Sequence, residues 1–214
     1  MKPLYEKYRP KTFEEFIGNE KIIERLRRLE QRGGLSGRAY WIAGPSGTGK
    51  TTLAYLIAGR TADPFWIDEW DATELTPSAL RDLENTLNLY GGGEKKGRAV
   101  IVNEAHGLRR DTVRQLLVFL ERLPSHVVFI FTTTLEGQLS FEDMDDSAPL
   151  LSRCIELRLS SQGLAPLFAQ RAKQIAQAEQ LDGKPLESYL NLVKKCRNNL
   201  RAVLQEIEKG TMIE

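Results

Sequence analysis

The sequence is poor in cysteine, because its 214 residues include only Cys154 and Cys196. Two thiols are too few for a disulfide framework or for a four-cysteine zinc site. Long apolar runs are also missing: no stretch approaches the roughly 20 apolar residues of a membrane-spanning helix. The opening MKPLYEKYRPKTFEEF lacks the apolar core of a secretory signal peptide. We therefore expect a soluble protein of a reducing intracellular compartment, without a membrane partner.

An excess of either charge is absent as well. The 30 Lys and Arg residues nearly balance the 29 Asp and Glu residues, which leaves a formal net charge of +1. Because this charge exerts little long-range attraction on a polyanion, any nucleic-acid contact must come from a local basic patch. What the chain does have is 41% hydrophobic and 28% charged residues, which is typical of a globular protein with a core. Its length favours one large domain, or a medium and a small one.

Five short apolar runs between residues 38 and 159 alternate with helical patterns. The runs are AYWIA (39–43), FWI (65–67), AVIV (99–102), HVVFIFT (126–132) and CIELRL (154–159). Continuous apolar runs are typical of strands that are buried on both faces of a parallel sheet. The alternation predicts an α/β domain over residues 1–160, with a parallel five-stranded sheet between helices.

Helix signals separate and follow these runs. Thr76-Pro77 is typical of an N-cap and a first helical residue, and Asp111 is the expected cap of a second helix. After Leu159 the strand signal ends, and helical patterns predict a small all-helical lid domain over residues 161–214. These patterns lie at 160–180, 186–196 and 199–209.

Two segments are predicted to be loops. The first, residues 90–97, reads YGGGEKKG and is flexible because of its glycines. The second, residues 136–149, carries four clustered carboxylates, namely Glu142, Asp143, Asp145 and Asp146. We interpret this second segment as a solvated acidic loop. A cation site is the alternative, although the spacing is not that of an EF-hand.

The strongest motif is GPSGTGKT at residues 44–51, which matches the phosphate-loop pattern G-x-x-x-x-G-K-[ST]. It follows the AYWIA run and precedes an apolar helical pattern, the strand–loop–helix setting that phosphate binding needs. Lys50 is expected to bridge the β- and γ-phosphates, and the Thr51 hydroxyl to ligate Mg²⁺. The predicted nucleotide-binding residues of this segment are Gly44, Pro45, Ser46, Gly47, Thr48, Gly49, Lys50, Thr51 and Thr52.

A second motif, Asn103-Glu104-Ala105-His106, follows the AVIV run. Phosphate-loop enzymes need an acidic residue near Mg²⁺ at the end of a neighbouring strand, and often a second one that polarises the attacking water. Glu104 stands at the position of a general base, whereas Asn103 stands where an aspartate is expected and brings no charge to the metal. Losing such a carboxylate typically lowers metal affinity or activity roughly 10–100-fold. We therefore predict a site that binds metal and nucleotide but hydrolyses slowly. The alternatives are that Glu104 only ends a strand and that His106 is a structural residue.

Two strings precede the phosphate loop, LYEKYRP (4–10) and FEEFIGNE (13–20). With the motifs above, they resemble the clamp-loader branch of the AAA+ ATPases, meaning the replication factor C small subunit and the bacterial DNA polymerase III loader subunits. The resemblance implies ATP as the nucleotide, and it implies a base pocket formed by Arg9, Pro10, Ile17 and Gly18. Read without the resemblance, the segment is a polar arm before a helix.

Two further motifs of this family imply catalytic roles. FIFTTT (129–134) resembles the sensor 1 strand, which implies that Thr134, or Thr133, probes the γ-phosphate. LSRC (151–154) resembles the Ser-Arg-Cys motif, whose arginine, here Arg153, reaches the nucleotide of the neighbouring subunit. Ordinary β-propensity and a surface ion pair are the respective alternatives.

The resemblance also implies a phosphate contact from the lid and contacts with DNA. NLRAVL (199–204) resembles sensor 2, which makes Arg201 the phosphate contact, with an exposed helix arginine as the alternative. In clamp loaders the helices that line the ring follow the DNA backbone. The matching residues here are 76–78 and 107–114, including Arg109, Arg110 and Arg114. A solvated face is the alternative to these phosphate contacts, and a DNA partner implies association with the nucleoid in a prokaryote.

The resemblance covers residues 4–209, with departures. Besides Asn103, the sequence has Val118-Phe119 where the family commonly has basic residues. It also has no helical collar and no zinc-binding cysteines like those of the bacterial subunits. We therefore expect a homo- or hetero-oligomer formed through the ATPase faces or other subunits.

Three functions are compatible with these features. The leading hypothesis is an ATP-hydrolysing clamp-loader-like subunit that acts on DNA and on a sliding clamp or another ring partner. A different AAA+ DNA motor, such as a helicase loader or a branch-migration ATPase, is expected to need a further DNA-binding domain. The third hypothesis is an ATP-binding scaffold that hydrolyses poorly. Under the first hypothesis, Asn103→Asp should raise an existing, DNA-stimulated ATP turnover. Under the third, ATP turnover should stay near background.

Overall fold

The computed structural model describes residues 2–144 and 146–213, and these residues form two compact units. The sheet unit consists of Lys21–Gly44 and Lys50–Leu159. The helical unit combines the N-terminal residues up to Glu20, the loop Pro45–Gly49 and the C-terminal residues from Ser160 onward. The N-terminal segment therefore belongs to the same compact unit as the C-terminal helices. The predicted domains 1–160 and 161–214 stay a prediction.

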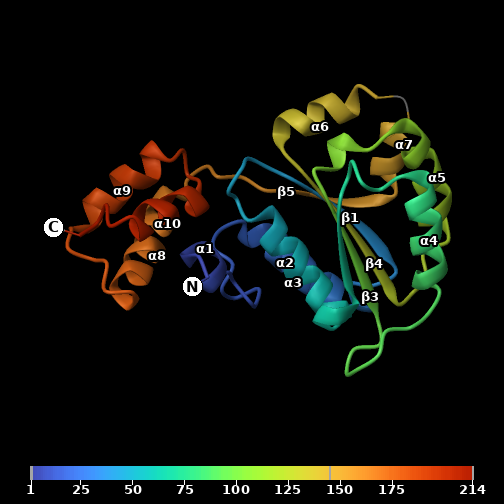
Figure 1. Cartoon of the computed structure of the whole chain (residues 1–214), viewed down its shortest axis with the longest axis horizontal. Helices are drawn as coiled ribbons and strands as arrows, with labels where there is room; N and C mark the ends of the chain where they lie inside the picture. Colours follow the sequence, from blue (N-terminus) through green and yellow to red (C-terminus); the bar gives the residue numbers. More distant parts are fainter. Residues whose placement is uncertain (1, 145, 214) are drawn as a thin grey trace. The chain divides into compact units, whose positions relative to one another are not determined.

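A parallel five-stranded sheet forms the centre of the sheet unit, in the order β2-β3-β4-β1-β5 (Figure 1). Its strands are β1 Arg38–Ala43, β2 Ile67–Asp71, β3 Arg98–Asn103, β4 Val127–Thr133 and β5 Cys154–Arg158. Every neighbouring pair is parallel. Nearly all residues of β1, β3 and β4 are buried, which is why their sequences are continuous apolar runs. The predicted α/β fold with a five-stranded parallel sheet is confirmed.

The second strand lies later in the chain than the sequence predicts. Phe65 and Trp66 of the predicted FWI strand belong, with Pro64, to a 3-10 turn, η1, and β2 begins only at Ile67. Pro64 lacks an N–H group and has a restricted φ, which favours the first position of such a turn over a strand. Because β2 is an edge strand with β3 as its partner, it is half-exposed and its sequence, IDEWD, does not form an apolar run.

Helices cover both faces of the sheet (Figure 1). They are α2 Glu20–Gln31, α3 Lys50–Thr61, α4 Pro77–Leu87, α5 Arg110–Glu121, α6 Leu135–Glu142 and α7 Ser147–Ser152, with a 3-10 turn, η2, at Ala105–Gly107. Thr76 caps α4 as predicted, since its hydroxyl accepts the N–H of Ala79 at 3.2 Å. No helix in residues 2–144 and 146–213 is long and apolar enough to cross a membrane.

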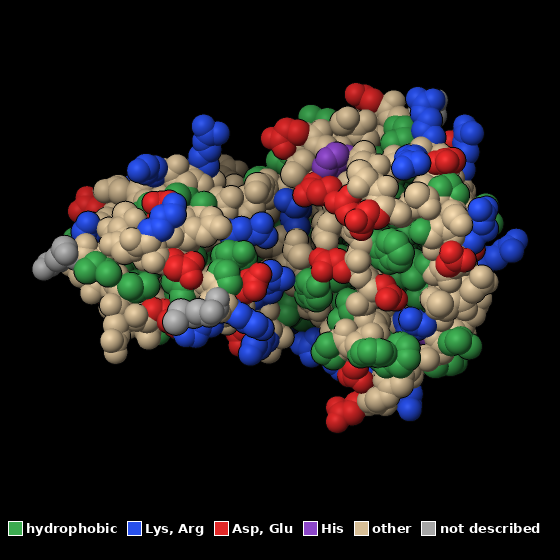
Figure 2. All heavy atoms as spheres, viewed as in Figure 1, with side chains coloured by type: hydrophobic (Ala, Val, Ile, Leu, Met, Phe, Trp, Pro, Cys, Tyr) green, Lys and Arg blue, Asp and Glu red, His purple; other side chains and the backbone are tan. Residues whose placement is uncertain are grey.

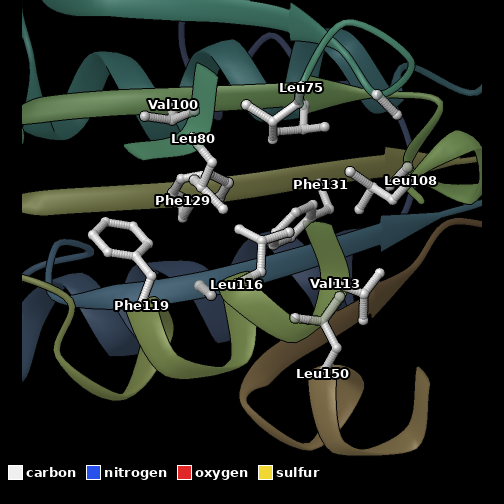
Figure 3. Close-up of a cluster of buried hydrophobic side chains, with 14 of the residues drawn as sticks. Leu75, Leu80, Val100, Leu108, Val113, Leu116, Phe119, Phe129, Phe131 and Leu150 are labelled. Carbon is white, nitrogen blue, oxygen red and sulfur yellow. The ribbon is translucent and has the colours of Figure 1, made fainter. Parts of the chain in front are cut away.

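The predicted cap of α5 is wrong. The helix begins at Arg110 with Arg109 as its N-cap, while the Asp111 carboxylate accepts the N–H of Thr112 at 2.8 Å. Leu108 and Val113 are buried in the same core cluster at the two positions of a hydrophobic staple, which starts the helix ahead of Asp111. Figure 3 shows both side chains in this cluster.

The predicted loop 136–149 is also wrong, because it contains all of α6 except Leu135 and the first half of α7. Thr134 caps α6 by accepting the N–H of Gly137 at 3.0 Å, and Phe141 and Leu150 are buried in the core. Asp145 lies outside the described residues. Within the rest of the chain no group of three or more His, Cys, Asp or Glu side chains is arranged to hold a metal ion.

Aromatic side chains form the centre of the sheet unit's core. Trp41 of β1 packs against Phe131 of β4 and Phe141 of α6, with ring centroids 5.3 and 4.7 Å apart. Figure 3 shows Phe129 and Phe131 facing the leucines of the covering helices. Such close packing holds the strands in register, so that the residues that end them are held at one edge of the sheet.

The helical unit consists of α1 Leu4–Lys7, α8 Ala165–Ala178, α9 Leu186–Lys195 and α10 Leu200–Glu208. Its core includes Phe168, Tyr189 and Ile207, and Leu4 of α1 belongs to the same cluster. The three predicted helical patterns after residue 160 are confirmed. The N-terminal segment is tied to this unit by Tyr8, whose hydroxyl donates to the Glu179 carboxylate.

Candidate nucleotide site

The phosphate loop connects β1 to α3 and depends on its glycines. Gly47 and Gly49 have φ angles of 77° and 92°, in the region that favours glycine. A Cβ atom on Gly47 would lie 2.1 Å from the side chain of Asn199, and one on Gly49 would lie 2.9 Å from Phe16. The first turn of α3 has no acidic residue. No side chain of that turn therefore neutralises the positive potential at the helix N-terminus, which favours the binding of an anion.

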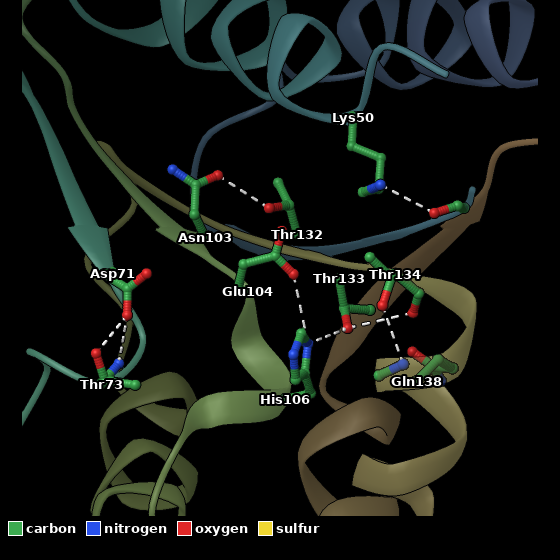
Figure 4. Close-up of polar contacts among 12 residues, drawn as sticks. Lys50, Asp71, Thr73, Asn103, Glu104, His106, Thr132, Thr133, Thr134 and Gln138 are labelled. Carbon is green, nitrogen blue, oxygen red and sulfur yellow. Dashed lines mark hydrogen bonds and ion pairs between the residues drawn. The ribbon is translucent and has the colours of Figure 1, made fainter. Parts of the chain in front are cut away.

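Lys50 and Thr51 are the first two residues of α3, next to the carboxyl end of β1. The Lys50 ammonium donates to the carbonyl of Gly44, the residue that follows β1, at 2.9 Å (Figure 4). Thr51 is half-buried. Both residues therefore lie at the carboxyl end of β1, where ligands bind in open α/β sheets.

Asn103 is the last residue of β3, and its amide is bonded on both sides; Figure 4 shows the bond to Thr132. Its Oδ1 accepts the Thr132 hydroxyl of β4 at 2.9 Å, and its Nδ2 donates to Oε1 of Glu69, on β2, at 2.6 Å. Glu69 is not among the site residues predicted from the sequence. The signal that could have found it is the pairing of β2 with β3, because Asp71 lies opposite Asn103 and Glu69, two residues earlier, lies on the same face.

Glu104 follows Asn103 in a left-handed backbone conformation, with φ 50° and ψ 46°. A non-glycine residue in this region costs roughly 1–3 kcal/mol and is found preferentially at functional sites. Its exposed carboxylate lies 3.5 Å from Nδ1 of His106, and the same ring nitrogen lies 3.1 Å from the Thr133 hydroxyl (Figure 4). His106 therefore connects Glu104 to the end of β4.

The two candidate sensor threonines have different surroundings. Thr133 is the last residue of β4, is buried, and contacts His106 through its hydroxyl. Thr134 is the N-cap of α6, so its hydroxyl already accepts an N–H group. The Thr133 hydroxyl also donates to the Thr134 carbonyl at 3.3 Å, so both threonine hydroxyls have partners within the chain. The sensor role stays a prediction for both.

Arg153 follows α7 and is held by its own chain. Its Nη1 donates to the Pro149 carbonyl at 2.8 Å, and its Nη2 forms an ion pair with the Glu121 carboxylate of α5. Its Nε is buried without a hydrogen-bond partner in the described part of the chain. The guanidinium is therefore positioned but not fully bonded.

The next residue, Cys154, supports the placement of Arg153. It packs against the core of the sheet unit, and burial, followed by the charge of Glu156, raises the pKa of its thiol to about 12. The raised pKa lowers the thiolate fraction, and the accompanying gain in the nucleophilicity of the thiolate offsets about half of that loss on a logarithmic scale. Cys154 thus behaves as a small apolar anchor at the start of β5.

We expect Cys154 to react with an aromatic disulfide reagent at pH 8 roughly 30- to 60-fold more slowly than an ordinary thiol. The measurement uses Cys196→Ser, so that Cys154 is the one remaining thiol. Urea-unfolded protein serves as the control and should react at the ordinary rate. Equal native and unfolded rates would show that Cys154 does not anchor this segment.

The predicted base-pocket residues and Arg201 belong to the helical unit. Gly18 has a φ of 76°, and a Cβ atom on it would lie 2.5 Å from Leu164. Ile17 packs against the helical core. Arg201 is exposed on α10, with its guanidinium 5.5 Å from the centroid of the Tyr5 ring. Arg9 and Pro10 are half-buried in the segment that follows α1.

The three arginines predicted to touch DNA lie at the start of α5 and are exposed. Arg114 forms an ion pair with Asp146 at 2.8 Å, which partly offsets its charge. Figure 2 shows Lys and Arg side chains gathered at the end of the sheet unit where Figure 1 places α5 and α7. A local basic patch is therefore present, although the net charge of the chain is close to zero.

Comparison with known proteins identifies the family. The profile of the ATPase family associated with various cellular activities (AAA) matches residues 40–159. This range includes the phosphate loop and the Asn103-Glu104 motif. The chain belongs to the AAA family of ATPases. Nucleotide binding follows from this membership, and the predicted AAA fold with a helical C-terminal region is confirmed.

The relatives of this AAA chain are clamp-loader subunits, as its motifs predict. The DNA polymerase III subunit gamma/tau of Mycobacterium tuberculosis is 32% identical over 155 residues, which cover 61% of this chain and 27% of that protein. The replication factor C small subunit of Haloarcula marismortui is 31% identical over 161 residues, covering 72% and 46%. Replication factor C small subunit 1 of Pyrobaculum islandicum is 28% identical over 196 residues, covering 88% and 55%. The AAA chain thus spans between about a quarter and about half of the length of these relatives.

Among solved structures, RuvB of Thermotoga maritima, described as a Holliday junction branch migration motor, resembles this AAA chain with a TM-score of 0.69 at 23% identity. The match covers 94% of this chain and 64% of that one. At this identity the likeness shows the shared fold alone. It supports the assignment of the helices after residue 160 to the same fold.

Proposed function

We propose that this AAA chain binds ATP with Mg²⁺, hydrolyses it at junctions between subunits, and uses the cycle to act on DNA or on a ring-shaped partner that encircles DNA. The observation that carries the proposal is the meeting of Lys50, Asn103 and Glu104 at the carboxyl ends of β1 and β3 (Figure 4). A lysine after the phosphate loop and a glutamate after a neighbouring strand are residue types that nucleotide hydrolysis uses, whereas Asn103 stands in place of the expected aspartate.

The residues at this edge fit Mg²⁺. In phosphate-loop enzymes Mg²⁺ is held by the Ser or Thr hydroxyl of the loop and by an aspartate, and waters and substrate phosphates complete its shell, so it needs no all-protein cage. Thr51 supplies a hydroxyl, and Oδ1 of Asn103 keeps a second lone pair beyond its bond to Thr132. Mg²⁺, when bound, neutralises charge on the transferred phosphoryl group. Thr51 would hold it directly and Asn103 through a metal-bound water.

The remaining groups have distinct roles. The Lys50 ammonium exchanges the Gly44 carbonyl for phosphate oxygens. Glu104 orients the attacking water, because its carboxylate is exposed and follows the end of β3 at the same edge of the sheet as Asn103. His106, between Glu104 and Thr133, holds the carboxylate in place until a phosphate engages the end of β4.

Arg153 is proposed to complete the site of a neighbouring subunit. The support is its position in the LSRC motif together with the clamp-loader names of the relatives. Acting in trans requires Arg153 to exchange the Glu121 carboxylate for a phosphate. This exchange should cost little free energy, because a carboxylate and a phosphate both offer anionic oxygens that a guanidinium can bind in a bidentate manner.

The partner assignments follow from the same comparison. Exposed arginines at the start of α5 provide a basic patch for the DNA backbone. A homo- or hetero-oligomer of AAA subunits, acting on a sliding clamp or another ring, is the assembly that the names of the relatives support. The base pocket of Arg9, Pro10, Ile17 and Gly18 and the phosphate contact of Arg201 belong to this proposal.

A second function rests on one specific observation, the amide of Asn103 in place of a carboxylate. A chain that binds ATP but turns it over poorly would serve as a scaffold or regulatory subunit. Nucleotide-dependent assembly would then be its output.

The test is steady-state ATP hydrolysis over a range of protein concentration, with and without primed DNA, beside a direct measurement of ATP binding. We expect specific activity to rise with protein concentration and again with DNA, because each site needs a neighbour. ATP binding with flat, DNA-independent turnover would favour the scaffold instead. Absence of ATP binding would overturn both functions.

A further inference from the structure

Glu69 is a carboxylate that the edge strand β2 brings to the predicted metal position. Its Oε1 accepts Nδ2 of Asn103 at 2.6 Å, and its Oε2 accepts the Tyr55 hydroxyl at 2.5 Å. Tyr55 lies on α3 four residues after Thr51, so the two share one face of that helix. Glu69 is thereby bonded both to the strand and to the helix that carry the proposed metal-holding residues.

The neighbouring carboxylates of β2 are engaged elsewhere. Asp68 forms an ion pair with Arg98 at 3.5 Å. Asp71 accepts the N–H and the hydroxyl of Thr73, at 2.9 and 2.5 Å, which holds the pKa of its carboxyl below the ordinary value. Among the described carboxylates of this strand, Glu69 is the one bonded to Asn103.

Glu69 determines which way the amide of Asn103 points. An ionised carboxylate can only accept hydrogen bonds, so it selects the orientation in which Nδ2 faces it. Oδ1 must then face the Thr132 hydroxyl, as observed. The bond to an anion is stronger than a neutral one and polarises the amide, which makes Oδ1 a better acceptor.

We infer that Glu69 supplies, through Asn103, the negative charge that this AAA chain lacks at the usual aspartate position. The pair Glu69–Asn103 acts as one unit, with the amide facing the Mg²⁺ shell and the carboxylate providing charge and orientation behind it. Glu69 is therefore a positioning residue. The inference rests on the proposed function, because it presupposes that Mg²⁺ and nucleotide bind at this edge of the sheet.

The experiment titrates Mg²⁺ against the binding of mant-ADP, a fluorescent nucleotide, to the full chain. Glu69→Gln retains the size of the side chain and an acceptor for Nδ2 but removes the charge. We expect it to bind mant-ADP like the unmodified chain in EDTA and to require roughly 10–100-fold more Mg²⁺ for the metal-dependent gain in affinity. Asp68→Asn, on the same strand with the same loss of charge, is the matched control and should titrate like the unmodified chain.

The charge-swapped double variant Glu69→Gln/Asn103→Asp separates charge from structure. It restores one carboxylate and one amide in the same pair, in exchanged positions. Asn103→Asp alone is its reference, because a carboxylate at position 103 can favour Mg²⁺ by itself. We expect Glu69→Gln to raise the Mg²⁺ requirement less in the Asn103→Asp background than in the unmodified chain, whereas a purely structural role of Glu69 predicts the same increase in both backgrounds. This comparison remains informative even where the single variant is less stable.

The two possible failures are distinguishable. If the unmodified chain shows a Mg²⁺-dependent gain in mant-ADP affinity and Glu69→Gln shows the same midpoint, the inference about Glu69 is wrong and the nucleotide site stands. The same increase in the Mg²⁺ requirement in both backgrounds likewise contradicts it. If the unmodified chain binds no mant-ADP at any Mg²⁺ concentration, the proposed function itself fails.

Discussion

Arg153→Ala is expected to lower ATP turnover of the assembled chain by roughly 10³–10⁵-fold, the effect of removing an arginine finger supplied by a neighbour. ATP binding should be nearly unchanged, because the finger acts on the transition state rather than on the bound nucleotide. The measurement is turnover at saturating ATP beside equilibrium ATP binding. Arg158→Ala is the control: Arg158, an exposed arginine, is likewise paired with a carboxylate, that of Glu156 at 3.0 Å. This variant should keep the ATP turnover of the unmodified chain.

Mixing two inactive variants tests whether Arg153 acts in trans. A Lys50→Ala chain cannot hold phosphates but still carries the finger, and an Arg153→Ala chain has the reverse defect. A 1:1 mixture should regain activity at those junctions where the two defects fall on different subunits. A mixture as inactive as its components would show that Arg153 serves its own subunit or only the Glu121 ion pair.

Glu104→Gln is expected to reduce ATP turnover by about 10²–10⁴-fold, the usual contribution of a positioned general base. Glutamine retains the size and the backbone preference of glutamate, so the left-handed conformation at this position is no more strained than before. ATP binding should persist, so the variant is expected to remain in the ATP-bound state. A filter-binding assay for retained ATP, beside a phosphate-release assay, measures both effects.

The control for this prediction is Glu74→Gln, an exposed carboxylate in the segment that follows β2. It removes the same charge from the same unit without touching Asn103 or His106. Full activity in Glu74→Gln with loss in Glu104→Gln supports the role of a base. Persistent turnover in Glu104→Gln means that another group orients the water, and the proposed role of Glu104 is then abandoned.

Contiguous motifs could be interpreted from the sequence alone. The phosphate loop needs glycines and a Lys-Thr pair at fixed spacing along one loop, so its residues are adjacent in the chain as well as in space. The cap at Thr76 is equally local, since a threonine before a proline favours only the first turn of the helix behind it. The buried strands β1, β3 and β4 were recognisable because burial on both faces leaves only apolar residues.

Features that depend on two distant segments were not predictable in this way. The edge strand β2 has one partner, so its sequence mixes charged and apolar residues and carries no strand signal. The start of α5 depends on the burial of Leu108 against the core, and α6 and α7 are folded by Phe141 and Leu150, which reach the same core. Tertiary burial overrides local preference in each of these cases.

The candidate site shows the same division. By itself the sequence determined that this chain holds a phosphate-loop motif, a glutamate at position 104 and an uncharged residue at position 103, because these are identities at fixed spacings. Only the tertiary structure decided that Asn103 lies against Glu69 and that Thr133, not Thr134, contacts His106. These contacts join strands separated by about thirty residues of chain, and the register of the parallel sheet, set by core packing, brings them together.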